Sequence, residues 1–195
     1  SQHPAAVGMQ RLIEQGAPLE AMFTLMMRFS WPQLTAGDLP RWAPRRWNHH
    51  LWDFYTRYEL DAFWANNHAQ EWQEAQAQAG RIFAGVNFHE FLAPFVGDVA
   101  ETLVFAPHIS YPAERTLGIR ARQQIIAIVP PPLAWGDSPP WPYDKDSLIS
   151  STYASALTQY SRVLLMTYLH QHADRLNGLT DEALPVSDGF RARHP

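Results

Sequence analysis

The stretch from Ser147 to Leu176 constrains the fold most, because it predicts one long helix in a chain that contains 16 prolines. Asp146 or Ser147 can cap its start, and Asn177-Gly178 is a good stop signal. Its stripe of mostly apolar residues consists of Leu148, Tyr153, Ala156, Leu157, Tyr160, Val163, Leu164, Met166, Thr167 and Leu169. Because these residues recur close to every three or four positions, the pattern predicts a helix packed along one face.

The middle of this predicted helix is polar where a core helix need not be. Its polar residues are Thr158, Gln159, Ser161 and Arg162. The stiff, proline-rich segment PPPLAWGDSPPWPYDKD leads straight into the helix and carries Trp135 and Trp141. These two rings could roof whatever lies against the helix. We therefore expect a site of present or former function at this place.

Composition limits the class of protein. With 195 residues, 46% hydrophobic and 17% charged, the chain suits a single globular domain over residues 1–195. A formal net charge of −4, with Lys and Arg scattered along the chain, argues against nucleic-acid binding. No apolar run approaches the roughly 20 residues that span a bilayer. The absence of cysteine excludes disulfides, Cys-bound zinc and thiol catalysis, but leaves the compartment open.

The first part of the chain predicts helices followed by an irregular connection. A helical stripe covers 7–30, with a break at Gly16-Ala17-Pro18. Three prolines and a glycine predict an irregular segment over 31–47. One cluster of aromatic and basic residues in this segment could bind an anion or stack on a sugar, or it could anchor the segment to the body. It consists of Trp42, Arg45, Arg46 and Trp47.

Two further helical segments follow in the sequence. Residues 48–84 predict one long helix or a hairpin of two, with a kink or turn at Asn66-Asn67. Residues 85–97 predict a short amphipathic helix that Asn87 caps and that a proline and a glycine end. With the preceding segments, they predict a helical subregion over 1–97.

Two short apolar runs rich in β-branched residues, 101–110 and 123–129, predict strands. The residues between them resemble a turn around Gly118, so we expect an antiparallel pair at the edge of a small sheet. These strands and the long helix predict a second subregion over 98–178, followed by a loose tail over 179–195. The predicted fold class is α+β, mainly helical, with the small sheet packed near the long helix.

The stretch Leu157-Thr158-Gln159-Tyr160-Ser161-Arg162-Val163-Leu164 carries a resemblance to a known family. Helices, a strand, a turn, a strand, a proline-containing loop and then a long helix resemble the gluzincin-type zinc metallopeptidases. The closest resemblance is to bacterial domains of unknown function whose helix reads roughly L-x-H-E-F-S-H-x-L. It covers roughly residues 50–175. The correspondence places Thr158 and Arg162 at the two zinc-binding histidines and Gln159 at the general-base glutamate.

On this correspondence the metal chemistry is lost. Threonine is a poor zinc ligand, arginine is a permanent cation, and glutamine cannot accept a proton from water as a carboxylate can. The resemblance therefore implies a non-catalytic domain without a cofactor or metal, serving as a binding or structural module, for example in an extracytoplasmic assembly. Its partner would be a peptide, a protein or a small anionic ligand. The candidate binding residues are Thr158, Gln159, Arg162, Trp135 and Trp141.

Arg162 has two possible roles in this interpretation. Its guanidinium could fill the place of the absent zinc and pair with a carboxylate of the chain, for which Glu59, Asp61 and Glu90 are the candidates. Alternatively, the guanidinium could present its planar fork to an anionic ligand or to a peptide carboxylate. The first role closes the site and the second opens it to a ligand.

Two other functions stay open. An active hydrolase could use an unidentified nucleophile, or a metal held by His89 and Glu90 or by His170 and Asp174 with Glu182. A helical interaction domain without peptidase ancestry would lack the strand pair. No phosphate-binding loop, nucleophile elbow or dinucleotide fingerprint occurs, and the stretch that begins at His89 lacks the second histidine of H-E-x-x-H.

Overall fold

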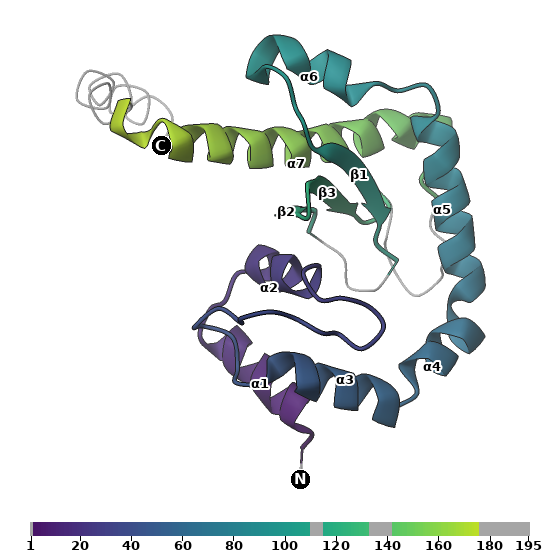
Figure 1. Ribbon diagram of the computed structural model, residues 1–195. Coiled ribbons are helices and arrows are strands. Elements are labelled where there is room, and N and C mark those ends of the chain that lie inside the picture. Colours follow the sequence, from purple (N-terminus) through teal and green to yellow (C-terminus); the bar gives the residue numbers. More distant parts are fainter. Residues whose placement is uncertain (1, 110–114, 133–141, 176–195) are drawn as a thin grey trace, which may run out of the picture.

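The protein is described by a computed structural model that covers residues 2–109, 115–132 and 142–175. Its elements in chain order are α1 (Pro4–Glu14), α2 (Leu19–Met26), α3 (Trp47–Arg57), α4 (Leu60–Asn67), α5 (Ala69–Phe83), α6 (Phe88–Val96), β1 (Thr102–Pro107), β2 (Leu117–Ala121), β3 (Gln124–Val129) and α7 (Asp146–Gln171). Helices α4 and α5 connect the α1–α3 group to α6 and α7, and the sheet lies between α2 and α7 (Figure 1). The fold is mainly helical α+β, as the sequence predicts.

The helical predictions are largely confirmed, with one correction. Helix α7 is the predicted long helix, α1 and α2 are separated at the predicted break, and α6 follows its predicted cap, where Oδ1 of Asn87 accepts from the Glu90 amide at 3.2 Å. The segment 48–84 forms three helices rather than one or two. Glu59 adopts a left-handed backbone with φ of 46°, which a helix cannot propagate, and His68 separates α4 from α5.

The two predicted strands exist, but the prediction of their antiparallel pairing is wrong. Strands β1 and β3 pair parallel, and β2 pairs antiparallel with β3 in the sheet order β1-β3-β2. Strand β2 occupies part of the segment that the sequence suggested was a turn around Gly118. The reversal lies at Arg122 and Gln123 instead, with φ of 49° and 62°. Two left-handed residues form the tight turn that suits the twist of a hairpin, so β3 folds back beside β2.

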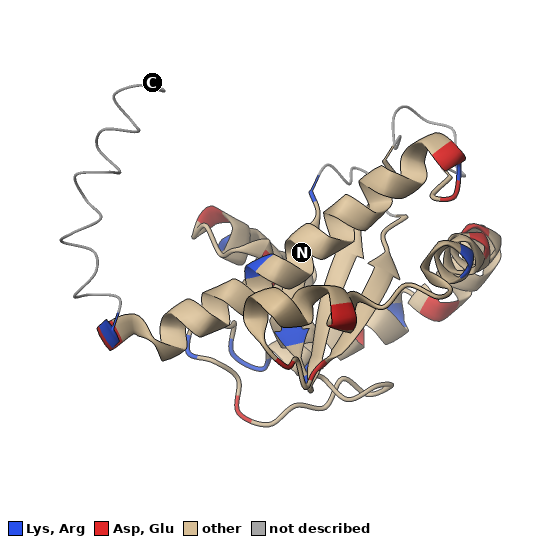
Figure 2. Cartoon of the chain, turned by 90° about the horizontal axis from the view of Figure 1, so that it is seen from above, with Lys and Arg blue, Asp and Glu red and all other residues tan. Residues whose placement is uncertain are grey.

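Strand β3 is buried on both faces because two helices cover the sheet. Ile125, Ala127 and Val129 pack in the cluster that includes α7, whereas Ile126 and Ile128 pack in the cluster that reaches α2. The positions of Lys, Arg, Asp and Glu lie on the helices and on the connecting segments, and Arg120 is the only charged residue within β1, β2 and β3 (Figure 2). The sheet is therefore the middle layer between α2 and α7, and β2 forms one of its two edges.

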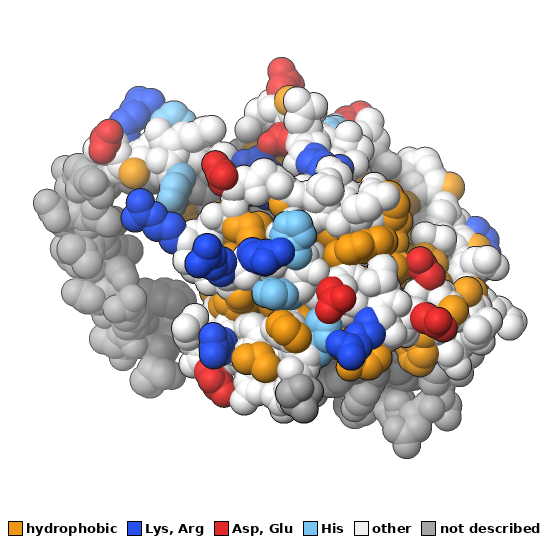
Figure 3. Space-filling view, turned by 60° about the horizontal axis from the view of Figure 1, so that its bottom comes forward, with side chains coloured by type: hydrophobic (Ala, Val, Ile, Leu, Met, Phe, Trp, Pro, Cys, Tyr) orange, Lys and Arg blue, Asp and Glu red, His pale blue; other side chains and the backbone are white. Residues whose placement is uncertain are grey.

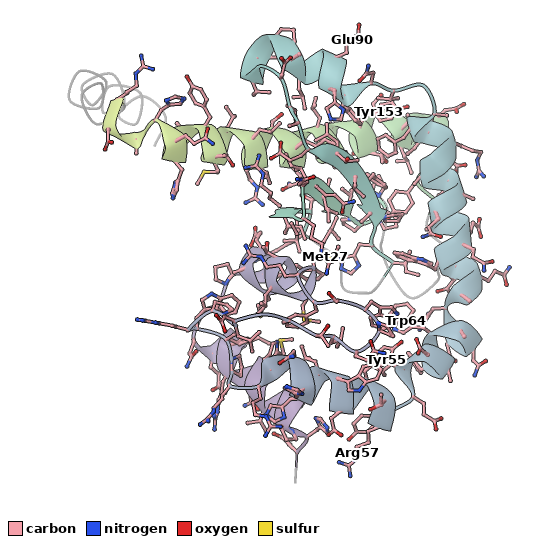
Figure 4. The ribbon with its side chains drawn as sticks, in the orientation of Figure 1. Met27, Tyr55, Arg57, Trp64, Glu90 and Tyr153 are labelled. Atoms are coloured by element: carbon pink, nitrogen blue, oxygen red, sulfur yellow. The ribbon has the colours of Figure 1, made fainter. Side chains whose placement is uncertain are left out.

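Two tyrosines fasten the sheet and α7 to α5. The hydroxyl of the fully buried Tyr143 donates to the Val129 carbonyl at 2.7 Å and accepts from the His108 amide at 3.0 Å. Burial raises the pKa of Tyr143, so this hydroxyl stays protonated. Tyr153 of α7, labelled in Figure 4, donates to the carbonyl of Ile82 in α5. These contacts fix the orientation of the layer that carries the predicted site.

A separate cluster of buried side chains holds α1, α2 and α3 together. It includes Leu12, Met22, Leu25 and Trp47, of which Trp47 is only 2% exposed. Helix α2 therefore contributes to two clusters of packed side chains, because Phe23 on the same helix packs against the sheet. In the described part of the chain, no helix combines the length and hydrophobicity that crossing a membrane requires.

Candidate binding groove

The structure brings together two of the three residues predicted on the long helix. Gln159 is 6% exposed, and its Nε2 donates to Oγ1 of Thr116 at 2.7 Å. Its Oε1 accepts from Nε of Arg162 at 3.1 Å. Thr158 is exposed and does not line the groove described below. The two tryptophans predicted to roof the site, Trp135 and Trp141, lie outside the described residues.

Arg162 reaches from α7 across to α2. One Nη2 hydrogen bond, at 3.2 Å, goes to the carbonyl of Gly118 in β2, and the same nitrogen lies 3.3 Å from Oε1 of Glu20 in α2. Arg162 thus pairs with a carboxylate, but the partner is not one of the three predicted residues, Glu59, Asp61 and Glu90. Sequence patterning placed α2 in the helical half and gave no sign that it covers the sheet.

The outer edge of β2 carries backbone groups that face away from the sheet. Ala121 and Gln124 flank the two-residue turn and are paired residues. In such a hairpin the flanking pair exchanges hydrogen bonds, and the pattern then alternates along the strands. Gly118 and Arg120 therefore direct their N–H and C=O groups outward. Among the described residues, the hydrogen bond from Arg162 to Gly118 is the only one on this edge.

A groove of about 840 Å³ opens along this edge, between the two helices that cover the sheet. Its apolar lining includes Val163 and Met166, which give a ligand surface to bury, whereas Ile119 is only 2% exposed. The polar groups lie among these apolar ones. They belong to Glu20, Thr24, Arg120, Arg162, Thr167, His170 and Gln171. The groove thus combines a strand edge that pairs with no further strand among the described residues, an apolar surface and two arginines.

Arg120 is the second arginine of the groove and is held on the α7 side of β2. Its Nη2 lies 2.7 Å from Oε1 of Glu101, and its Nη1 donates to the hydroxyl of Thr167. Its Nε is buried and, within the described residues, has no hydrogen-bond partner. A buried donor without a partner is uncommon and costly, so this arginine is kept in place at some expense of stability.

Gly118 allows α7 to approach the strand closely. A Cβ at this position would lie 2.9 Å from the Gln159 carbonyl oxygen and 3.0 Å from the Gln159 Cβ. These distances are shorter than van der Waals contact, so a side chain would push α7 away from β2. The glycine therefore sets the spacing at which Arg162 can reach the strand edge.

The alternative metal sites are not assembled in the described residues. Nε2 of His89 lies 2.8 Å from the carbonyl oxygen of Glu101, and Glu90 takes part in the Asn87 cap. His170 lines the groove. Glu182, proposed as a third ligand with His170, lies outside the described residues. No group of three His, Asp or Glu side chains suited to a metal ion occurs in the part of the chain that the structure describes.

Comparison with known proteins adds no relative. No protein-family model, no curated protein and no solved structure matches the chain. The assignment of function therefore depends on the geometry of the groove. One sequence signal could have indicated strand β2 at the groove: Gly118 and Arg120 alternate with its apolar residues, as on one face of a strand.

Proposed function

We propose that this chain is a non-catalytic, metallopeptidase-like binding module that holds an extended peptide in the groove between α2 and α7. The observation that carries the proposal is the outward-facing edge of β2, which opens into the groove beside Arg162. A strand edge with free donors and acceptors is a template for another extended chain. The peptide would add as a further strand and would be bound through its backbone.

The groove also supplies an anchor for a carboxylate. The ion pair between Arg162 and Glu20 is exposed, with side chains 44% and 38% accessible, and its closest atoms are 3.3 Å apart. Exposed pairs of this kind contribute at most about 1 kcal/mol. A peptide carboxylate could therefore displace Glu20 and take both donors of the guanidinium fork, which is the stronger arrangement.

Side-chain preference follows from the walls of the groove. Val163 and Met166 offer apolar contact, and Met166 is 55% exposed. Methionine adapts its shape to different apolar partners, which suits a site that accepts more than one sequence. Because neighbouring residues of an extended peptide point to opposite sides, we expect alternate apolar residues to be preferred.

The metallopeptidase-like part of the proposal is supported by the position of α7 against the sheet and by the contact between Gln159 and Arg162. If the correspondence holds, a glutamine and an arginine occupy the places of the base and of one zinc ligand. Their mutual hydrogen bond orients Arg162 toward the strand edge. The same helix face would then serve recognition in place of hydrolysis.

Backbone pairing can be tested with a designed peptide. The probe is an acetylated hexapeptide of alternating valine and threonine, compared with versions N-methylated at single positions. N-methylation removes a donor and widens the backbone, so methylation at positions that pair with β2 should weaken binding about tenfold or more. Methylation at the alternate positions should change the affinity by less than about threefold.

Amide chemical shifts provide the second readout for the same peptide. Binding should shift the backbone amide resonances of Gly118 and Arg120 more than those of Ile125 and Ala127, which lie in the central strand. Equal loss of affinity at every methylated position would overturn the pairing. Shifts confined to residues outside the groove would overturn the site itself.

A further inference from the structure

A second pocket, of about 520 Å³, lies between α1 and the segment that precedes α3 and shares no lining residue with the groove. The underside of the protein, where α1 and α3 lie in Figure 1, carries Arg and His side chains gathered around hydrophobic ones (Figure 3). The pocket is lined by Arg11 of α1, by Trp42 and Arg45 of the connecting segment, and by His50 of α3. This location is independent of the peptide groove.

The two arginines of this pocket have no ion-pair partner among the described residues. Arg11, Arg45 and His50 make no side-chain hydrogen bond or ion pair within the described parts of the chain, and no acidic side chain lines the pocket there. The chain as a whole carries a formal charge of −4, so this concentration of positive charge runs against its average. Two guanidinium groups facing one pocket suit the tetrahedral oxygens of a phosphate or sulfate.

Trp42 gives the same pocket a flat apolar surface. Its side chain is 41% exposed, whereas Trp47, five positions later in the same predicted cluster, is buried at 2%. The two tryptophans thus divide the roles that the sequence left open, because Trp47 anchors the segment and Trp42 remains available. An exposed indole can stack on the apolar face of a sugar ring, and the amides of Gln2 and Gln15 in the lining can bond to hydroxyl groups.

The buried Trp47 also fixes the two sides of the pocket, α1 and the segment before α3, relative to each other. A Cβ on Gly8 of α1 would lie 2.3 Å from the Trp47 ring and 3.3 Å from Pro44, so only a glycine permits this approach. Arg46 adopts a left-handed backbone with φ of 58° and turns the chain into α3. The backbone at Arg45 is therefore fixed on the rim opposite α1.

From these observations we propose that the pocket binds a phosphorylated sugar: the phosphate lies between Arg11 and Arg45, and the ring lies on Trp42. The volume suits a small ligand. The positive charge selects the phosphate, and the indole with the two glutamine amides selects the ring that carries it. A free inorganic anion would use the arginines alone and would leave Trp42 without a partner.

The test uses glucose 6-phosphate as the probe, with glucose and inorganic phosphate as comparisons, and measures binding by titration calorimetry at low salt. We expect glucose 6-phosphate to bind at least about tenfold more tightly than either comparison. Failure to bind at about 10 mM would overturn the proposal. Equal binding of inorganic phosphate would also overturn it, because an anion site without ring recognition is not a sugar-phosphate site.

Three variants locate the site, and a fourth provides the matched control. Arg11→Gln and Arg45→Gln should each weaken binding about tenfold, because each removes one charged donor pair. Arg41→Gln removes the same charge from a nearby exposed position that does not line the pocket, and should change the affinity less than about twofold. Trp42→Ala should reduce the preference for glucose 6-phosphate over inorganic phosphate. Equal effects of all three arginine changes would show long-range attraction only, and would overturn the proposed site.

Discussion

The peptide groove and the basic pocket both contain two arginines, but they use them differently. In the groove, Arg162 is bound to Glu20 and Arg120 to Glu101, so each charge is already paired within the chain. In the basic pocket, Arg11 and Arg45 have no such partner among the described residues. The groove is lined mainly by neutral surface around paired charges, whereas the pocket presents its charge directly.

This difference indicates what each surface selects. A paired arginine must exchange one carboxylate for another, so the net gain from the charge is small and most affinity must come from backbone and apolar contact. An unpaired arginine gains the full interaction with an anion, less the cost of its desolvation. We therefore expect ligands of the groove to be chosen by shape and strand pairing, and ligands of the pocket by charge.

The largest expected effect comes from replacing Gly8, the glycine behind the basic pocket. Gly8→Ala places a methyl group 2.3 Å from the buried ring of Trp47 and should destabilise the fold by about 3 kcal/mol. The control is Gly80→Ala in α5, where nothing lies within 4 Å and alanine should stabilise by about 0.5 to 1 kcal/mol. Urea unfolding measures both. Equal stability of the two variants would show that Trp47 is not fixed against α1.

The corresponding glycine behind the groove should be less sensitive. Gly118→Ala meets the Gln159 carbonyl at 2.9 Å, a milder overlap, so we expect a loss of about 1 to 2 kcal/mol in urea unfolding. The displaced α7 should also carry Arg162 away from the strand edge and weaken peptide binding. A variant as stable as wild type, with unchanged peptide affinity, would contradict the close packing of α7 on β2.

Removing the internal carboxylate sharpens the contrast between paired and unpaired arginines. Glu20→Gln should change stability by less than about 1 kcal/mol, because the ion pair is exposed. It should raise the affinity of the groove for a peptide carboxylate about threefold, since Arg162 no longer has to release Glu20. Binding at the basic pocket should not change. A large fall in the melting temperature of Glu20→Gln would show instead that the ion pair between Arg162 and Glu20 stabilises the fold.

The smallest expected effect is a change in stability at low pH, which tests a region that belongs to neither site. Burial lowers the pKa of His108, which follows β1 near Tyr143. The folded protein therefore holds this proton less strongly than the unfolded chain, and its stability should fall as the pH drops below the ordinary histidine value of 6.5. The His108→Gln variant lacks this contribution to the pH dependence of stability. The melting temperature of wild type relative to His108→Gln should thus decrease between about pH 7.5 and pH 5.5, and a constant difference would contradict the shift.

Local patterning predicted the helices better than it predicted the sheet. The spacing of apolar residues along α7 and the cap at Asn87 are local signals, and both elements form. Strand β2 was missed because Gly118 and Arg120 interrupt its apolar pattern, and a glycine there suggests a turn. Sequence distance gave no hint that β3 would enter between β1 and β2, since strand order depends on which faces the helices cover.

The candidate site was predicted in part for the same reason. Gln159 and Arg162 are neighbours on one helix, so their contact follows from helical spacing. Glu20 lies far from them in sequence, and its approach depends on the packing of α2 through Phe23 against the sheet. The basic pocket shows the same pattern, because the cluster at Trp42 and Arg45 is visible locally in the sequence, whereas the contribution of Arg11 requires the folded structure.

The most direct test of the peptide groove is a cycle of two changes, one in the protein and one in the ligand. The hexapeptide is prepared with a free carboxyl end and with an amide end, and each form is titrated into wild type and into Arg162→Gln. We predict that wild type binds the free acid about threefold more tightly than the amide, and that the variant binds the two forms with equal affinity. An unchanged preference in the variant, or no preference in wild type, would contradict the proposed role of Arg162.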